Sequence, residues 1–167
     1  FAEGAICPIF EEFDSSRQLM SCDIEDAAER RRIMATDAFG ELFVSEWHDS
    51  GAVSTFNRDL DAMHVERCPV AQWQGETFGA IFRRLQQFQA GERGAARSEA
   101  EAATLASFPD PIGREGSFLL HLVRRYDREL RWWFTVANDR PEILEKLLFH
   151  RHMLPGFNDS GAHLINL

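Results

Sequence analysis

The sequence predicts an α+β fold, in which a small antiparallel sheet in the N-terminal half precedes a helical C-terminal region. Two observations predict it. Short segments rich in Val, Phe, Ile and Thr alternate with turn residues up to about residue 66. After Pro69, apolar residues recur at the three- and four-residue spacing of a helix. We therefore expect an α+β domain over 1–70 and a helical region over 71–167.

The first half is expected to open with a helix and to continue as three or four strands. Ser21 or Asp23 is a suitable N-cap for a helix that runs to about Arg32. The strands follow from short β-branched and aromatic runs, and they are expected at 32–38, 41–47, 52–57 and 62–66.

The first two helices of the second half are predicted by an apolar stripe and by a capping pattern. The stripe consists of Phe78, Ile81, Phe82, Leu85 and Phe88, which Thr77 would cap. Ser98 and Glu101 form a capping box that opens the next helix, and prolines close that helix near Phe108.

Two further helices are expected before the chain ends. Ser117 can cap a long helix that continues to about Asn138. Asp139 and Pro141 then begin another helix, because aspartate is a good N-cap and proline suits the first turn.

Charge and composition exclude some partners. The net charge is −9, so binding to the nucleic-acid backbone, which needs a basic face, is not expected. An acidic surface suits a protein partner, for which a basic protein is one candidate. No apolar run approaches the roughly 18 residues of a membrane span. The three cysteines are sparse and odd in number, so we expect a cytoplasmic, reducing location. Neither a cofactor nor a metal is expected.

The last third of the chain, from about residue 110, resembles ankyrin repeats. Leu120-His121-Leu122 matches the Leu-His-Leu pattern of the family's inner helix. Residues 143–148 resemble its outer helix, and residues 158–161 (NDSG) resemble its turn. The family's Thr-Pro pair is replaced by Phe118-Leu119, and the glycine-to-glycine period is about 45 residues against about 33 in the family. The resemblance implies an inner helix lengthened through residues 131–134. It also implies either a fragment of a longer array or an end piece, since one repeat cannot bury its own apolar face.

The candidate partner-binding residues follow from this resemblance and from one tryptophan. In an ankyrin-like arrangement, residues 152–159 would form a projecting finger that touches a partner, with His152, Phe157, Asn158 and Asp159 as contacts. Trp132 is expected to be partly exposed on the long helix, near three arginines, while Trp133 faces the core. A second packing layer over Trp132 explains the same pattern equally well. No catalytic residue is assigned.

The leading hypothesis is therefore a non-enzymatic interaction module, and two alternatives stay open. The first is an acidic inhibitor or immunity-type protein that covers a basic partner, since residues 37–44 (DAFGELFV) resemble a strand of some bacterial immunity and adaptor domains. The second is an enzyme whose site is assembled from dispersed residues, for which the candidates are His48, Asp59, His64 and Cys68.

Overall fold

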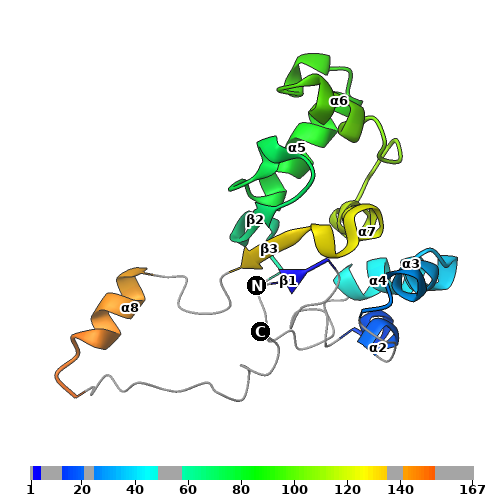
Figure 1. The fold of residues 1–167 in the computed structure, drawn as a ribbon. Coiled ribbons are helices and arrows are strands. Elements are labelled where there is room, and N and C mark those ends of the chain that lie inside the picture. The colour runs from blue at the N-terminus through cyan, green and yellow to red at the C-terminus, as the bar shows by residue number, and fades with distance from the viewer. Residues whose placement is uncertain (1, 5–12, 21–24, 49–57, 135–140, 153–167) are drawn as a thin grey trace. The chain divides into compact units, whose positions relative to one another are not determined.

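The computed structural model describes residues 2–4, 13–20, 25–48, 58–134 and 141–152, and the chain forms two compact units, 1–135 and 136–167 (Figure 1). The described part of the chain contains the α-helices α2 (Asp14–Met20), α3 (Ala27–Met34), α4 (Asp37–His48), α5 (Phe78–Gln89), α6 (Glu99–Leu105), α7 (Glu115–Tyr126) and α8 (Pro141–Leu148). Its strands are β1 (Ala2–Glu3), β2 (Met63–Arg67) and β3 (Arg131–Phe134). The α+β character is confirmed, with helices predominating.

The sheet takes its middle strand from the C-terminal half, which corrects the expectation of an N-terminal sheet. The strand order is β1-β3-β2, and both pairings are antiparallel. β3 occupies residues 131–134, so the expected long helix from Ser117 to Asn138 is wrong in its second half. The chain leaves the helix at Asp127, whose backbone φ is +44°, a conformation that an α-helix does not contain. The sheet also joins residues on both sides of the domain boundary expected near residue 70.

Residues 37–48 form helix α4, and the strand expected at 41–47 is wrong. Phe39, Phe43 and Trp47 are spaced four residues apart and are all buried, so they form one helical face. The Thr36 hydroxyl accepts a hydrogen bond from the Phe39 backbone N–H at 3.2 Å, which satisfies a donor in the first turn. The same finding removes the strand on which the resemblance to immunity domains depended.

Of the other elements predicted for the first half, a helix and one strand are present, one strand is wrong and one lies outside the described residues. The expected early helix is present as α3, but its N-cap is Asp26, whose carboxylate accepts from Ala28 and Glu29 at 3.0 Å. The strand expected at 32–38 is wrong, because α3 continues to Met34. The strand expected at 62–66 is confirmed as β2, and the one at 52–57 lies outside the described residues.

The expected helices at 78–88 and 99–108 are confirmed as α5 and α6, with their caps. Thr77 accepts from the Ala80 N–H at 3.1 Å, and Ser98 accepts from the Glu101 N–H at 3.1 Å. The apolar stripe of α5 is buried as expected, and it consists of Phe78, Ile81, Phe82, Leu85 and Phe88.

Helices α4 and α7 pack closely because each places a glycine against the other. A Cβ at Gly40 of α4 would lie 3.2 Å from Leu120, and a Cβ at Gly116 of α7 would lie 3.2 Å from Trp47. The same Cβ at Gly40, near the start of α4, would lie 2.5 Å from the Arg124 guanidinium near the end of α7, whereas Gly116 at the start of α7 lies against Trp47 at the end of α4. The two helices are therefore antiparallel.

An aromatic cluster connects the sheet to the helices. The Trp132 ring lies 5.5 Å from that of Phe78 on α5, and Phe78 lies 6.4 Å from Phe118 on α7. Phe118 in turn stacks at 5.6 Å on Phe108, which follows α6. The Trp132 indole N–H donates to the Gly4 carbonyl at 3.2 Å, so its polar atom is satisfied inside the core.

We predict that Trp132→Ala lowers the free energy of unfolding by about 3–5 kcal/mol, because it opens a large cavity in this cluster. The matched control is the neighbouring Trp133→Ala, which removes a side chain that is 39% exposed and is expected to cost less than about 1 kcal/mol. Urea denaturation followed by circular dichroism measures both. Equal effects of the two substitutions would contradict the placement of Trp132 in the core.

Candidate interaction site

Trp132 does not lie on the surface, and this corrects the expectation of partial exposure. It is 1% exposed, whereas Trp133 is 39% exposed. The reversal follows from the change of element, since neighbouring side chains of a strand point to opposite faces. Trp132 lies opposite Val65 of β2, which is fully buried, and the two share the inner face of the sheet. Trp133 lies on the other face, where its ring stacks on His64 at 4.1 Å.

His152 is exposed, as expected of a contact residue, and it follows α8 in a short turn. Its Nε2 accepts from the Arg151 guanidinium at 2.7 Å, and its backbone N–H donates to His150 Nδ1 at 3.3 Å. The other three residues of the expected finger, Phe157, Asn158 and Asp159, lie outside the described residues. Their assignment to a partner contact stays a prediction.

Helix α8 forms where the sequence predicts a helix after Asp139. Pro141 occupies its first position, where the missing N–H costs no intrahelical hydrogen bond. Glu142 lies in the first turn and Lys146 in the last, and both charges suit the helix dipole. The helix is eight residues long, too short to be stable in water by itself. Its stability therefore depends on packing of its apolar side chains.

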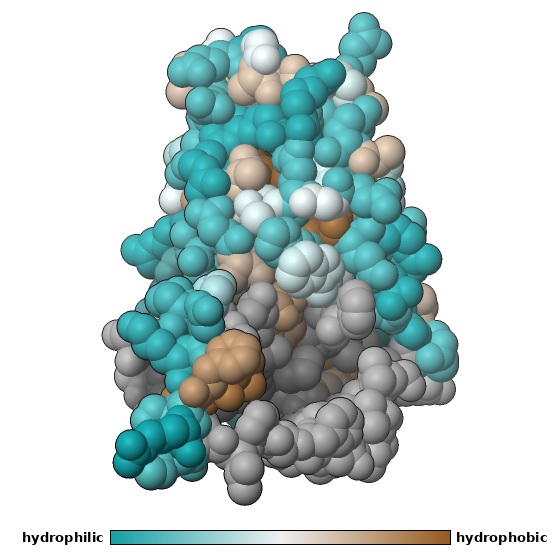
Figure 2. All heavy atoms as spheres, turned by 90° about the vertical axis from the view of Figure 1, so that its left-hand side faces the viewer, coloured by the Kyte–Doolittle hydropathy of each residue, from teal (hydrophilic) through white to brown (hydrophobic). Residues whose placement is uncertain are grey.

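Those apolar side chains are exposed in the described structure. Ile143, Leu147 and Leu148 are 41%, 43% and 44% exposed, and Phe149, which follows the helix, is 82% exposed. Elsewhere in the described part of the chain, only Met20 and Trp133 are large apolar residues with comparable exposure. Figure 2 shows brown, hydrophobic atoms gathered at α8 beside its hydrophilic residues. An apolar cluster of this kind on a short helix is typical of an interaction surface.

The four residues of the dispersed enzyme hypothesis have separate local roles. The His48 Nε2 accepts from the Gly116 N–H at 3.4 Å, and the Asp59 carboxylate caps a short 3-10 helix through the Asp61 N–H at 2.8 Å. His64 stacks on Trp133. The Cys68 thiol donates to the Val70 carbonyl at 3.1 Å.

Of these four residues, Cys68 has surroundings that disfavour a nucleophilic role. Burial raises the pKa of the Cys68 thiol, although its hydrogen bond to Val70 partly offsets the rise, so the reactive thiolate is disfavoured. Within the described ranges, no three His, Cys, Asp or Glu side chains are placed to hold a metal ion. None of the helices described has the length and apolar character that crossing a bilayer requires.

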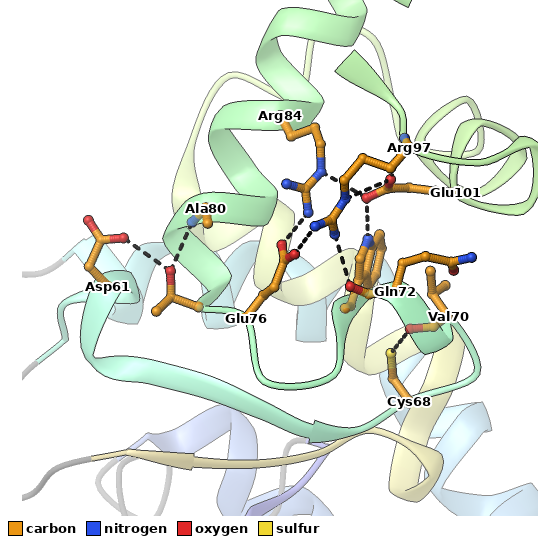
Figure 3. A network of polar contacts seen from close by, with 11 residues as sticks. Asp61, Cys68, Val70, Gln72, Glu76, Ala80, Arg84, Arg97 and Glu101 are labelled. Carbon is orange, nitrogen blue, oxygen red and sulfur yellow. Dashed lines mark hydrogen bonds and ion pairs between the residues drawn. The ribbon is translucent and has the colours of Figure 1, made fainter. Parts of the chain in front are cut away.

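The most elaborate polar cluster surrounds Glu101, which is fully buried (Figure 3). Its Oε1 accepts from the Trp73 indole N–H at 2.7 Å and from Arg84 Nε at 2.8 Å. Its Oε2 accepts from the Arg97 backbone N–H at 2.8 Å. Arg84 and Arg97 also pair with Glu76, and Arg97 donates to the Gln72 carbonyl at 2.9 Å.

The electrostatics of this cluster indicate a role in stabilising the fold. Burial raises the pKa of Glu101, but the hydrogen bonds from Arg97, Trp73 and Arg84 outweigh it and hold the pKa below its ordinary value. The ionised carboxylate therefore stays charged and fully hydrogen-bonded, which is the condition under which a buried charge is tolerated. It connects α6 to α5 and to the segment before α5.

Sequence reasoning found Glu101 as part of a capping box but missed its partners. In a capping box the carboxylate returns to the N–H of the capping residue, here Ser98. In the structure it accepts instead from the N–H of Arg97, one residue earlier. Arg84 forms ion pairs with both Glu101 and Glu76, which joins segments separated in the sequence, and no local pattern indicates these pairs.

His121 on α7 is half-buried, and its surroundings favour the neutral side chain, whereas those of Glu101 favour the charged one. Its Nε2 is buried without a hydrogen-bond partner in the described structure, and its ring lies 4.1 Å from that of Phe108. Burial, together with the nearby charges of Arg125 and Arg124, lowers the pKa of His121 to about 4. The neutral imidazole is therefore the form that fits the folded protein.

We predict that Glu101→Gln lowers the free energy of unfolding at pH 7 by about 2–4 kcal/mol, because it leaves the Arg84 guanidinium without its buried charge partner. The control is Glu99→Gln, an exposed position two residues earlier on α6, with an expected change below about 0.5 kcal/mol. Because the folded pKa of Glu101 is lowered, its contribution is present above the ordinary carboxyl pKa and is lost as pH falls below it. Urea denaturation of wild type and variant at several pH values should show their stabilities converging in acid.

We predict that His121 makes the protein less stable as the pH falls from about 6.5 toward about 4. The unfolded chain takes up a proton in that window and the folded protein does not, so stability rises with pH across it, by about 2–3 kcal/mol. His121→Phe should remove this slope, and the exposed His48→Gln should keep it. A slope unchanged by His121→Phe would assign it to other groups.

Comparison with known proteins gives relatives without an assigned function. No family model and no solved structure matches the chain. An uncharacterized protein of Mycobacterium tuberculosis and one of Mycobacterium bovis are each 29% identical to it over 168 residues. The alignment covers all of this chain but 23% of each relative, so the chain spans about a quarter of the length of the curated relatives it matches.

Proposed function

We propose that this chain acts as a non-enzymatic protein–protein interaction module and that α8 is its docking element. The observation that carries the proposal is the exposure of Ile143, Leu147, Leu148 and Phe149 within seven residues of one another. A helix too short to be stable by itself gains stability when a partner buries such side chains. In the proposal, α8 serves as the outer helix of an ankyrin-like repeat, as its sequence resemblance suggests, but without the lengthened inner helix, because residues 131–134 form β3.

The proposed partner is a protein that presents an apolar groove. Ile143 and Leu147 are spaced by four residues, as are residues 144 and 148, which is the anchor spacing of helices that bind in grooves. Glu142, Glu145 and Lys146 alternate with the anchors and would remain at the solvated rim. The net charge of −9 favours the approach of a basic partner. The proposed location is the cytoplasm, which the sparse and odd set of three cysteines favours.

The test is quantitative affinity capture from an extract of the source cells, with the 167-residue chain and two matched double variants immobilised. We expect Leu147→Gln with Phe149→Gln to reduce recovery of the principal partner at least about 10-fold, because each substitution removes a buried apolar contact. Glu142→Gln with Glu145→Gln changes the polar residues of the same helix and should leave recovery within about 2-fold.

Two outcomes would contradict the proposal. Equal recovery by both double variants would place the interface elsewhere on the chain. Sedimentation analysis that shows a self-associated chain, dissociated by Leu147→Gln with Phe149→Gln, would mean that a second copy covers α8 and not a different protein.

A further inference from the structure

A cleft of 560 Å³ lies between α4 and α7, in the unit that precedes α8. Its volume is within the range of small-molecule sites. Its walls are formed by one face of α4, by α7 and by the residue that precedes α7, and they consist of Asp37, Gly40, Glu41, Val44, Ser45, Arg114, Leu120 and Arg124. Neither the proposed function nor the structural polar cluster uses this cleft.

The floor of the cleft is apolar. Leu120 is 9% exposed and Val44 is half-buried, so both present carbon surface to the cleft. Gly40 has no side chain to fill the space, and a Cβ there would lie 2.5 Å from the Arg124 guanidinium. The absence of a side chain at Gly40 therefore leaves space in the cleft and lets the two helices approach closely.

The two arginines of the cleft differ in their partners. Arg124 donates to the Met34 carbonyl at 2.6 Å and to the Thr36 carbonyl at 2.9 Å. The carboxylate of Asp37, at the start of α4, favours the positive charge of the Arg124 guanidinium. Arg114 is exposed, and its side chain has no hydrogen bond or ion pair to any residue that the structure describes. Its guanidinium is the positively charged group of this cleft that remains available to a ligand.

The antiparallel packing of the helices separates these charges along the cleft. The contact between Gly40 and Arg124 places Asp37 and Glu41 toward the Arg124 end. The contact between Gly116 and Trp47 places Arg114 toward the opposite end, with Ser45. The carboxylates that line the cleft therefore gather near Arg124, and the Arg114 end presents a cation, a hydroxyl and the apolar floor.

We propose that this cleft binds a small organic carboxylate with an apolar body. Arg114 holds the carboxylate, since guanidinium and carboxylate match in geometry and form charge-assisted hydrogen bonds, and the Ser45 hydroxyl is a second donor. The apolar body covers Val44 and Leu120. This site is independent of α8, so it can fail or succeed without affecting the proposed interaction function.

The experiment is a titration of the isotope-labelled 167-residue chain with 1-naphthylacetate, followed by amide chemical shifts in NMR spectra. The background variant carries Leu147→Gln and Phe149→Gln, which removes the exposed apolar side chains of α8 as an alternative site for the probe. We expect saturable shifts confined to residues 37–45 and 114–124. The neutral isostere 1-naphthaleneacetamide should bind about 10-fold more weakly, because it lacks the charge that Arg114 recognises.

Arg114→Gln should weaken 1-naphthylacetate binding about 10-fold while the spectrum keeps its dispersion, since the Arg114 side chain is exposed and makes no described hydrogen bond or ion pair. The matched control is Arg31→Gln, an exposed arginine on α3 outside the cleft, and its binding should equal that of the background. Equal affinity for acid and amide, no effect of Arg114→Gln, shifts centred outside the cleft, or no saturable binding would each overturn the proposal.

Discussion

The burial of Trp132 is the constraint on which most of the structure depends. The indole lies on the middle strand of the sheet, between β1 and β2, and its polar atom reaches the carbonyl of Gly4. From this ring the aromatic contacts continue through Phe78 to Phe118 and Phe108, so that one residue ties the sheet to α5 and, through those rings, to α7 and the segment after α6. Aromatic rings provide large buried areas, and such pairs add further stabilisation through their edge and offset contacts.

The buried charged residues that the structure describes in the same unit, Arg30, Glu101 and Asp127, each have a charged partner. Arg30 of α3 donates to both carboxylate oxygens of Asp127, with Nη2 at 2.9 Å from Oδ2, and both side chains are less than a tenth exposed. The bidentate geometry holds the turn in which Asp127 adopts its positive φ and from which β3 begins. Gly4 packs so closely against that turn that a Cβ at this position would lie 2.6 Å from the Asp127 carbonyl oxygen. Desolvation offsets much of the attraction within such buried pairs, and removing one partner costs more than the intact pair contributes.

The two units differ in how they use their apolar residues. In the first unit, nearly all large apolar side chains that are described lie in one core, and its charged clusters bind its helices to one another. In the second unit, α8 has its apolar residues on the surface. This contrast is the physical reason for assigning the proposed interaction to α8. The relatives are about four times as long as this chain, so in them the corresponding segment belongs to a larger protein.

The sequence by itself determined the elements whose signals are local. The helical stripe of α5, its Thr77 cap, the Ser98 cap of α6, the proline start of α8 and the strand at β2 depend on neighbours within about four residues, and the structure confirms them. The exposed position of His152 was also expected. For residues 37–48, apolar spacing is compatible with both periods, and only packing of Phe39, Phe43 and Trp47 against the rest of the unit selects the helix.

The tertiary structure alone decided the fate of residues 127–134 and therefore which tryptophan is exposed. A run with Leu130, Trp133 and Phe134 looks helical locally, but Asp127 is held by Arg30, 97 residues away in sequence, and β3 pairs with strands from two distant segments. The partners of Glu101 and the cleft between α4 and α7 arise in the same way, from residues that are far apart in the chain. Single-sequence patterns report periodicity and capping within a few residues, whereas these features depend on long-range contacts that form only when the chain folds.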